Sequence, residues 1–119
     1  MIIESFAQDP ASVTLAAATE TSLMGGASGI DITGAEYVCI VLKNTGGNTI
    51  TAIDALVSPN GTNFVTMGLS LGTIAASALK LIRLTPADIG SAKRLKVTAT
   101  STSGSTVDVE VRAARSHTG

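Results

Sequence analysis

The chain has 119 residues, of which 45% are hydrophobic and only 3% aromatic, and its net charge is −1. This apolar content is enough for one folded domain and excludes a disordered chain. The near-neutral charge argues against a nucleic acid as the main partner, because binding phosphates requires a strongly basic face.

The two halves of the chain nevertheless carry opposite charge. Residues 1–60 contain six acidic residues and one basic residue, whereas residues 61–119 contain seven basic and three acidic residues. Two interpretations stay open: chance combined with pairing inside the chain, or complementary faces that meet between copies of the protein.

The chain is predicted to have three parts. Residues 1–11 (MIIESFAQDPA) show little periodicity and suggest an N-terminal arm or a short edge segment. Residues 12–114 are expected to form one domain, and residues 115–119 a flexible tail that carries His117, the single histidine. The N-terminus lacks the basic region of a signal peptide, and the uncharged run 55–79 is too rich in turn residues for a membrane span. We therefore expect synthesis in the cytoplasm and no membrane partner.

Short extended segments are expected at 12–15, 22–24 and 29–32. The run YVCIVLK, residues 37–43, predicts the strongest strand, because it is continuous, β-branched and too short for a helix. A turn cluster follows it, so that this strand and residues 49–57 are predicted to form a hairpin. Cys39, the single cysteine, is expected to be buried in this strand.

The stretch SPNGTNF, residues 58–64, is predicted to be a hairpin turn between extended segments. Pro59 presets φ for the first turn position, and Asn60-Gly61 tolerates the left-handed region. Asn60-Gly61-Thr62 also matches the pattern of an N-glycosylation acceptor, but without a secretion signal we expect only a turn.

The last third predicts three strands and one turn of helix. The strands are expected at 78–84, 94–100 and 106–113, and the last two are predicted to pair across the loop STSGST. Residues 106–113 alternate strictly, with valines on one face and charged residues on the other. Thr85-Pro86 predicts a helix start that Gly90 ends. The fold class is therefore all-β: an antiparallel β-sandwich, jelly-roll or immunoglobulin-like, with one short helical turn.

Residue patterns that would carry chemistry are missing. No nucleotide-binding loop or nucleophile elbow is present, and one histidine with one cysteine gives too few ligands for a transition metal. We expect no catalytic residue, no cofactor and no metal site, and therefore not an enzyme.

The run from Tyr37 to Ala113 resembles small β-sandwich virion proteins of tailed bacteriophages. The segments that carry the resemblance are YVCIVLKNTGG, ALVSPNGTNFVTM, LTPADIG and RLKVTATSTSGSTVDVEVRA. In size and composition the chain is most similar to capsid decoration (cement) proteins. The resemblance implies a homotrimer that binds the major capsid protein and stabilises the outer capsid surface of the virion.

Two other functions stay open on the sequence alone. One is a neck, tail or fibre-associated phage structural protein, and the other is a carbohydrate- or ligand-binding β-sandwich module, for which Tyr37 is a lone aromatic. For the virion function, Ile2, Ile3 and Phe6 are the predicted capsid or subunit contacts, because an apolar terminal arm can order on a partner. The loops 25–30 and 68–77 are the next candidates.

Overall fold

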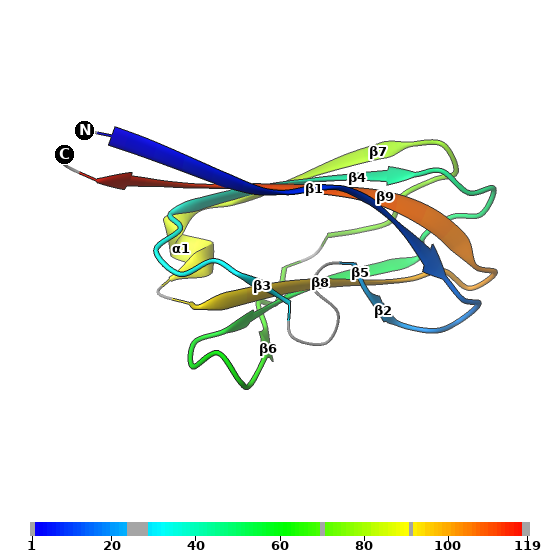
Figure 1. Ribbon diagram of the computed structural model, residues 1–119. Coiled ribbons are helices and arrows are strands. Elements are labelled where there is room, and N and C mark those ends of the chain that lie inside the picture. Colours follow the sequence, from blue (N-terminus) through cyan, green and yellow to red (C-terminus); the bar gives the residue numbers. More distant parts are fainter. Residues whose placement is uncertain (1, 24–28, 70, 91, 118–119) are drawn as a thin grey trace.

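In the computed structural model the chain folds into two antiparallel β-sheets that pack face to face (Figure 1). The structure describes residues 2–23, 29–69, 71–90 and 92–117. The elements are β1 (Ile2–Leu15), β2 (Thr21–Ser22), β3 (Ile30–Asp31), β4 (Tyr37–Asn44), β5 (Ala52–Ser58), β6 (Val65–Thr66), β7 (Leu79–Leu84), α1 (Pro86–Ile89), β8 (Arg94–Thr100) and β9 (Ser105–His117). The predicted all-β sandwich with one short helical turn is confirmed.

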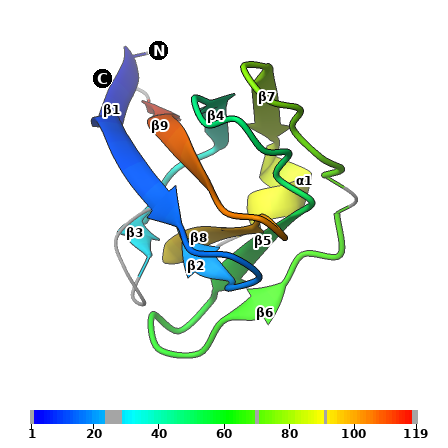
Figure 2. The same ribbon diagram turned by 90° about the vertical axis from the view of Figure 1, so that its right-hand side faces the viewer.

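The order of the strands is that of a jelly roll. One sheet has the order β1-β9-β4-β7 and the other β2-β8-β5-β6, and β3 also pairs with β8. The chain passes from sheet to sheet at most connections between the named strands, the exceptions being β2 to β3 and β5 to β6, and β1 and β9, the first and last of these strands, are neighbours (Figure 2). Of the two sandwich topologies expected from the sequence, this is the jelly roll and not the immunoglobulin-like one.

Two of the predicted hairpins are wrong. β4 pairs with β7 and β9, whereas β5 pairs with β6 and β8, so these consecutive strands lie in opposite sheets. The same holds for β8 and β9. In both cases the short connection crosses between the sheets instead of reversing within one. The buried Ser101 links the two crossings, because its hydroxyl donates a hydrogen bond to the carbonyl oxygen of Thr49 at 2.8 Å.

The core between the sheets is aliphatic. Alternation along β9 buries Val107, Val109 and Val111, as predicted, and each is at most 1% exposed. Other strands and loops contribute buried branched side chains, among them Leu15, Leu23, Ile32, Ile40, Leu42, Ile50, Ile53, Ile82, Leu84, Leu95 and Val97. The prediction that Cys39 is buried is wrong. It lies between the buried Val38 and Ile40 on β4, so its thiol points away from the core and is partly exposed.

Asn44, at the end of β4, is a fully buried polar residue that the sequence did not single out. Its amide nitrogen donates hydrogen bonds to the carbonyl oxygens of Asn48 (2.7 Å) and Ile74 (3.1 Å). Its side-chain oxygen accepts hydrogen bonds from the N–H of Gly46 (3.1 Å) and the hydroxyl of Ser105 (2.6 Å). One side chain therefore joins three segments that are far apart in the sequence.

The helical turn has the predicted start and end. The carboxylate of Asp88 accepts hydrogen bonds from the N–H (2.9 Å) and the hydroxyl (3.0 Å) of Thr85, which precedes α1. Pro86 takes the first helical position, and Gly90 ends the helix with φ 60°. This turn connects β7 to β8 and thus carries the chain from one sheet to the other.

The stretch SPNGTNF is a turn, as predicted. β5 pairs with β6 on either side of it, and the side-chain oxygen of Asn60 accepts hydrogen bonds from the N–H groups of Thr62 and Asn63, both at 2.9 Å. Gly61 has a φ of 83°, in the region that favours glycine.

Gly61→Val is expected to lower the free energy of unfolding by about 1 kcal/mol or more, because a β-branched residue is strained at this φ. Urea unfolding followed by circular dichroism measures the loss. Gly47→Val is the control, since Gly47 lies outside the left-handed region and a Cβ there meets nothing within 4 Å. Equal stability of the two variants would contradict the assigned backbone strain.

Candidate interaction surface

The two ends of the described chain form a two-stranded ribbon. β1 and β9 pair from Ile2↔His117 to Leu15↔Ser105, with a register shift between Gln8 and Ala11. β4 pairs with β9 only as far as Ala114, so beyond that residue β1 is the one described partner of β9. Figure 1 shows this end of the ribbon extending past α1, away from the sandwich. Two strands alone are marginally stable in water, so the ribbon is suited to ordering on a partner.

The predicted contact residues all lie in this ribbon. The register places Ile2, Ile3 and Phe6 opposite His117, Ser116 and Ala113. In the expected arm, residues 1–11, residues 2–4 pair with 115–117 of the expected tail, residues 115–119, and residues 5–8 and 11 pair with residues of β9 between 109 and 114. Their role as capsid or subunit contacts stays a prediction.

The two loops proposed as further contacts are described only in part. Residues 25–28 of the loop 25–30 lie outside the described residues, as does residue 70 of the loop 68–77. Within the second loop, Ile74 is buried and bridges Ile50 through reciprocal backbone hydrogen bonds of 2.9 and 3.0 Å. This loop is therefore anchored to the core next to Asn44. The bridge between Ile50 and Ile74 was not predicted from the sequence.

A second surface is the solvent side of the sheet β1-β9-β4-β7. We define the outer face as the outward side chains of its last three strands: Tyr37, Cys39, Val41 and Lys43 of β4, Leu79, Leu81 and Arg83 of β7, and Asp108, Glu110, Arg112 and Ala114 of β9. Apolar side chains on it are unusually exposed, with Tyr37 at 56%, Leu79 at 67% and Leu81 at 47%. β7 is also an edge strand, and exposed apolar edges tend to associate.

The strand register aligns the side chains of the outer face in rows that run across β7, β4 and β9, and each row is called a level. Cys39 lies between Arg83 and Arg112, and at the next level Val41 lies between Leu81 and Glu110. An apolar centre is therefore flanked by charge. The guanidinium of Arg112 and the carboxylate of Glu110 form an exposed ion pair, with 3.3 Å between Nε and Oε1.

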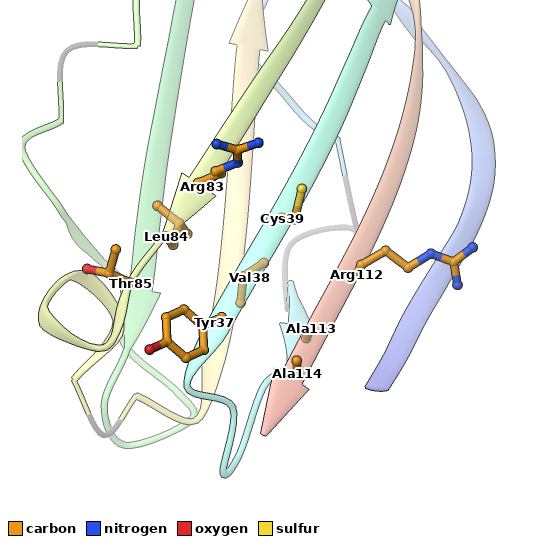
Figure 3. Close-up of a pocket in the computed structure, with 9 residues that line it drawn as sticks. All are labelled: Tyr37, Val38, Cys39, Arg83, Leu84, Thr85, Arg112, Ala113 and Ala114. Carbon is orange, nitrogen blue, oxygen red and sulfur yellow. The ribbon is translucent and has the colours of Figure 1, made fainter. Parts of the chain in front are cut away.

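A hollow of about 500 Å³ opens on this face. Its lining residues are Tyr37, Val38, Cys39, Arg83, Leu84, Thr85, Arg112, Ala113 and Ala114. In Figure 3 the side chains of Arg83 and Arg112 lie on either side of Cys39, and Tyr37 is at the end of the hollow. The lining offers apolar surface and two cations, which suits a contact with another molecule better than proton transfer.

The described residues show little else that could carry chemistry. Within them no group of three histidine, cysteine or acidic residues could hold a metal ion, and no helix is long and apolar enough to cross a membrane. The pKa of Asp31 lies below its usual value, because the hydroxyl and then the N–H of Thr33 hydrogen-bond to its carboxylate, with a smaller contribution from Arg94. That pattern stabilises the end of β3 and is a local turn contact.

The chain matches no protein-family model and no curated protein. Its fold is similar to that of the PBSX exported protein XepA, with a TM-score of 0.62 and 13% identity over 99% of this chain and 38% of XepA. It is also similar to a structure of Bacillus endospore appendages, described as disulfide-linked pili (0.55, 16%, 98% of this chain and 89% of that one). The SPBc2 prophage-derived protein YomS is a third (0.54, 12%, 96% of both). At such identities the likeness shows the fold alone.

Proposed function

We propose that the protein is a structural, non-enzymatic virion protein that decorates and stabilises a phage capsid. In this proposal the ribbon of β1 and β9 binds the major capsid protein on the outer surface of the particle, after synthesis in the host cytoplasm. The observation that carries the proposal is the ribbon itself, which pairs both ends of the described chain and extends past the sandwich.

Physical reasons favour such a role for the ribbon. The free edge of β1 has backbone groups available for a further strand, and the edge position of Pro10, next to the register shift, costs no hydrogen bond within the sheet. Adding a strand would give affinity through backbone hydrogen bonds. The conformational entropy lost when the ribbon becomes ordered would have to be offset by the burial of apolar area.

The fold is compatible with this proposal. Jelly rolls are common in viral capsid proteins. Among the similar structures, YomS is prophage-derived and the endospore appendages are disulfide-linked pili. These likenesses support a structural role in an assembly without naming its partner.

Removal of residues 2–9 tests the proposal. The truncated protein is expected to keep its melting temperature within a few degrees, because residues 11–15 still pair with β9 in the sandwich. It should no longer sediment with phage heads that lack their decoration protein. Ser103→Arg is the control, since Ser103 is exposed at the connection between β8 and β9, at the opposite end of β9 from its pairing with residues 2–9.

Two outcomes would redirect the proposal. Wild-type binding by the truncated protein would show that the ribbon is not the anchor, and the loops 25–30 and 68–77 would be the next candidates. Binding of the intact protein to necks, tails or fibres, but not to heads, would favour the neck, tail or fibre-associated function.

A carbohydrate- or ligand-binding module is the second candidate, and the exposed Tyr37 beside the hollow favours it. An aromatic ring next to cationic side chains can stack on a sugar or another planar ligand. Tyr37→Ala should abolish such binding while leaving the sedimentation with heads unchanged.

A further inference from the structure

The outer face has a pattern of charge that is complementary to itself. On β9, Arg112 and Glu110 point outward two residues apart, Arg112 at the level of Cys39 and Glu110 at the level of Val41. A second copy can be placed face to face with the first by a two-fold axis that lies between the two sheets, runs perpendicular to the strands and passes midway between these two levels. This rotation brings each of the two levels opposite the other level of the partner. Arg112 then faces the partner's Glu110, and Glu110 faces the partner's Arg112.

We propose that two copies of this chain bind each other through their outer faces about this two-fold axis. On β4, Cys39 meets the partner's Val41, and on β7 the aliphatic stem of Arg83 covers the partner's Leu81. At the ends of the contact, Tyr37 approaches the partner's Lys43, the geometry of a cation–π pair. The exposed apolar side chains are then buried in the centre, with alternating charges beside them.

The charges select this axis over the other simple one. An axis along the strands would bring β9 of one copy over β7 of the other, so that Arg112 would face the partner's Arg83 and Glu110 the partner's Leu81. Lys43 would also lie against the partner's Lys43. Like charges in contact are unfavourable, so only the axis across the strands gives a complementary interface.

The size of the face sets the expected strength. Three strands about 4.8 Å apart, each with about eight residues of about 3.4 Å rise, give a face of roughly 400 Å². Two such faces bury about 800 Å², which is below the size of a standard interface, so the dimer should be a weak one that forms in the upper micromolar range. The two-fold dimer differs from the homotrimer that the resemblance implies, and the mass in solution distinguishes them.

Charge-swap variants test the contact without disturbing the core. Arg112→Glu makes the β9 side of the face acidic, and Glu110→Arg makes it basic, so each variant alone should dimerise at least about tenfold more weakly than the wild type. Mixed in equal amounts, the two variants should form a heterodimer, and the double variant E110R/R112E should recover the wild-type mass. Sedimentation equilibrium across the micromolar range measures the dissociation constant of the two single variants, of their mixture and of the double variant.

Matched controls carry the same charge changes elsewhere. Asp54→Arg and Lys93→Glu alter exposed residues on and beside the other sheet and should leave the dimer unchanged. A monomeric wild type, a trimeric mass, or weak association of the mixed variants would overturn the proposal.

Cys39 provides a second measurement in the unmodified protein. Sheets packed about 10 Å apart, with the two thiols displaced by about two residues along the strands, place the two Cys39 Cα atoms about 12 Å apart. A short bis-maleimide should therefore link two chains and no more, through the single cysteine. If a monofunctional maleimide labels Cys39 completely while the bis-maleimide yields no dimer, the contact is not the proposed one.

Discussion

Asn44→Leu is expected to lower the free energy of unfolding by about 3 kcal/mol or more. The change removes a donor from two carbonyl oxygens and an acceptor from an N–H and a hydroxyl, all at a side chain that is fully buried. The carbonyl oxygen of Ile74 keeps its hydrogen bond from the N–H of Ile50, and the N–H of Gly46 keeps the carbonyl of Thr106. The loss therefore falls mainly on the carbonyl of Asn48 and the hydroxyl of Ser105, at about 1 to 3 kcal/mol for each group left without a partner. Urea unfolding at neutral pH measures the loss.

Asn44→Asp refines this test. The new carboxylate can still accept from Gly46 and Ser105, but its second oxygen faces the carbonyl oxygens of Asn48 and Ile74, so its pKa in the folded state should be raised. The penalty is then complete above the raised pKa, fades as the pH falls from there to the pKa of an unfolded aspartate, and is absent below it. Asn60→Asp is the control, because Asn60 acts there only as an acceptor. Equal losses for both variants at neutral pH would contradict the assigned network.

Gly29→Ala is expected to cost about 2 to 4 kcal/mol, from strain at positive φ together with overpacking. Gly29 has a φ of 65°, and a Cβ there would overlap the carbonyl oxygen of Leu95. That carbonyl cannot move easily, because Leu95 pairs with Ile30 on one side and with Val57 on the other.

Gly68→Ala separates the strain at positive φ from the overpacking. Gly68 has a φ of 70°, but a Cβ there meets nothing within 4 Å, so this variant should lose only about 1 kcal/mol. Thermal unfolding of both variants gives the comparison. If they are equally stable, the close approach of Gly29 to β8 does not contribute.

Local patterns in the sequence predicted the elements well. The strict alternation in β9 gave the correct buried face, and Thr85-Pro86 with Gly90 gave the helical turn. The turn around Gly61 was also predicted, because asparagine followed by glycine has few other uses between two strands. These features depend on residues that are close together in the chain.

Partners of the strands could not be predicted in the same way. A short connection such as 101–104 fits a hairpin as well as a crossing between sheets, and the choice depends on which distant strands occupy the two edges. Asn44 was missed for a similar reason, since its partners Ile74 and Ser105 lie 30 and 61 residues away. The outer face likewise appears only when β7 and β9 are placed on either side of β4.

The adjacency of the first and last strands also governs how the chain can fold. β9 lies between β1 and β4, so the sheet that carries the ribbon and the outer face lacks a central strand until β9 has been synthesised. Contacts between such distant segments have a high entropic cost of closure, which slows folding. Until then the apolar faces of β1 and β4 have no strand between them, and the growing chain is open to association with other chains. Chains that lack β9 are therefore expected to associate through these faces more readily than chains that include it.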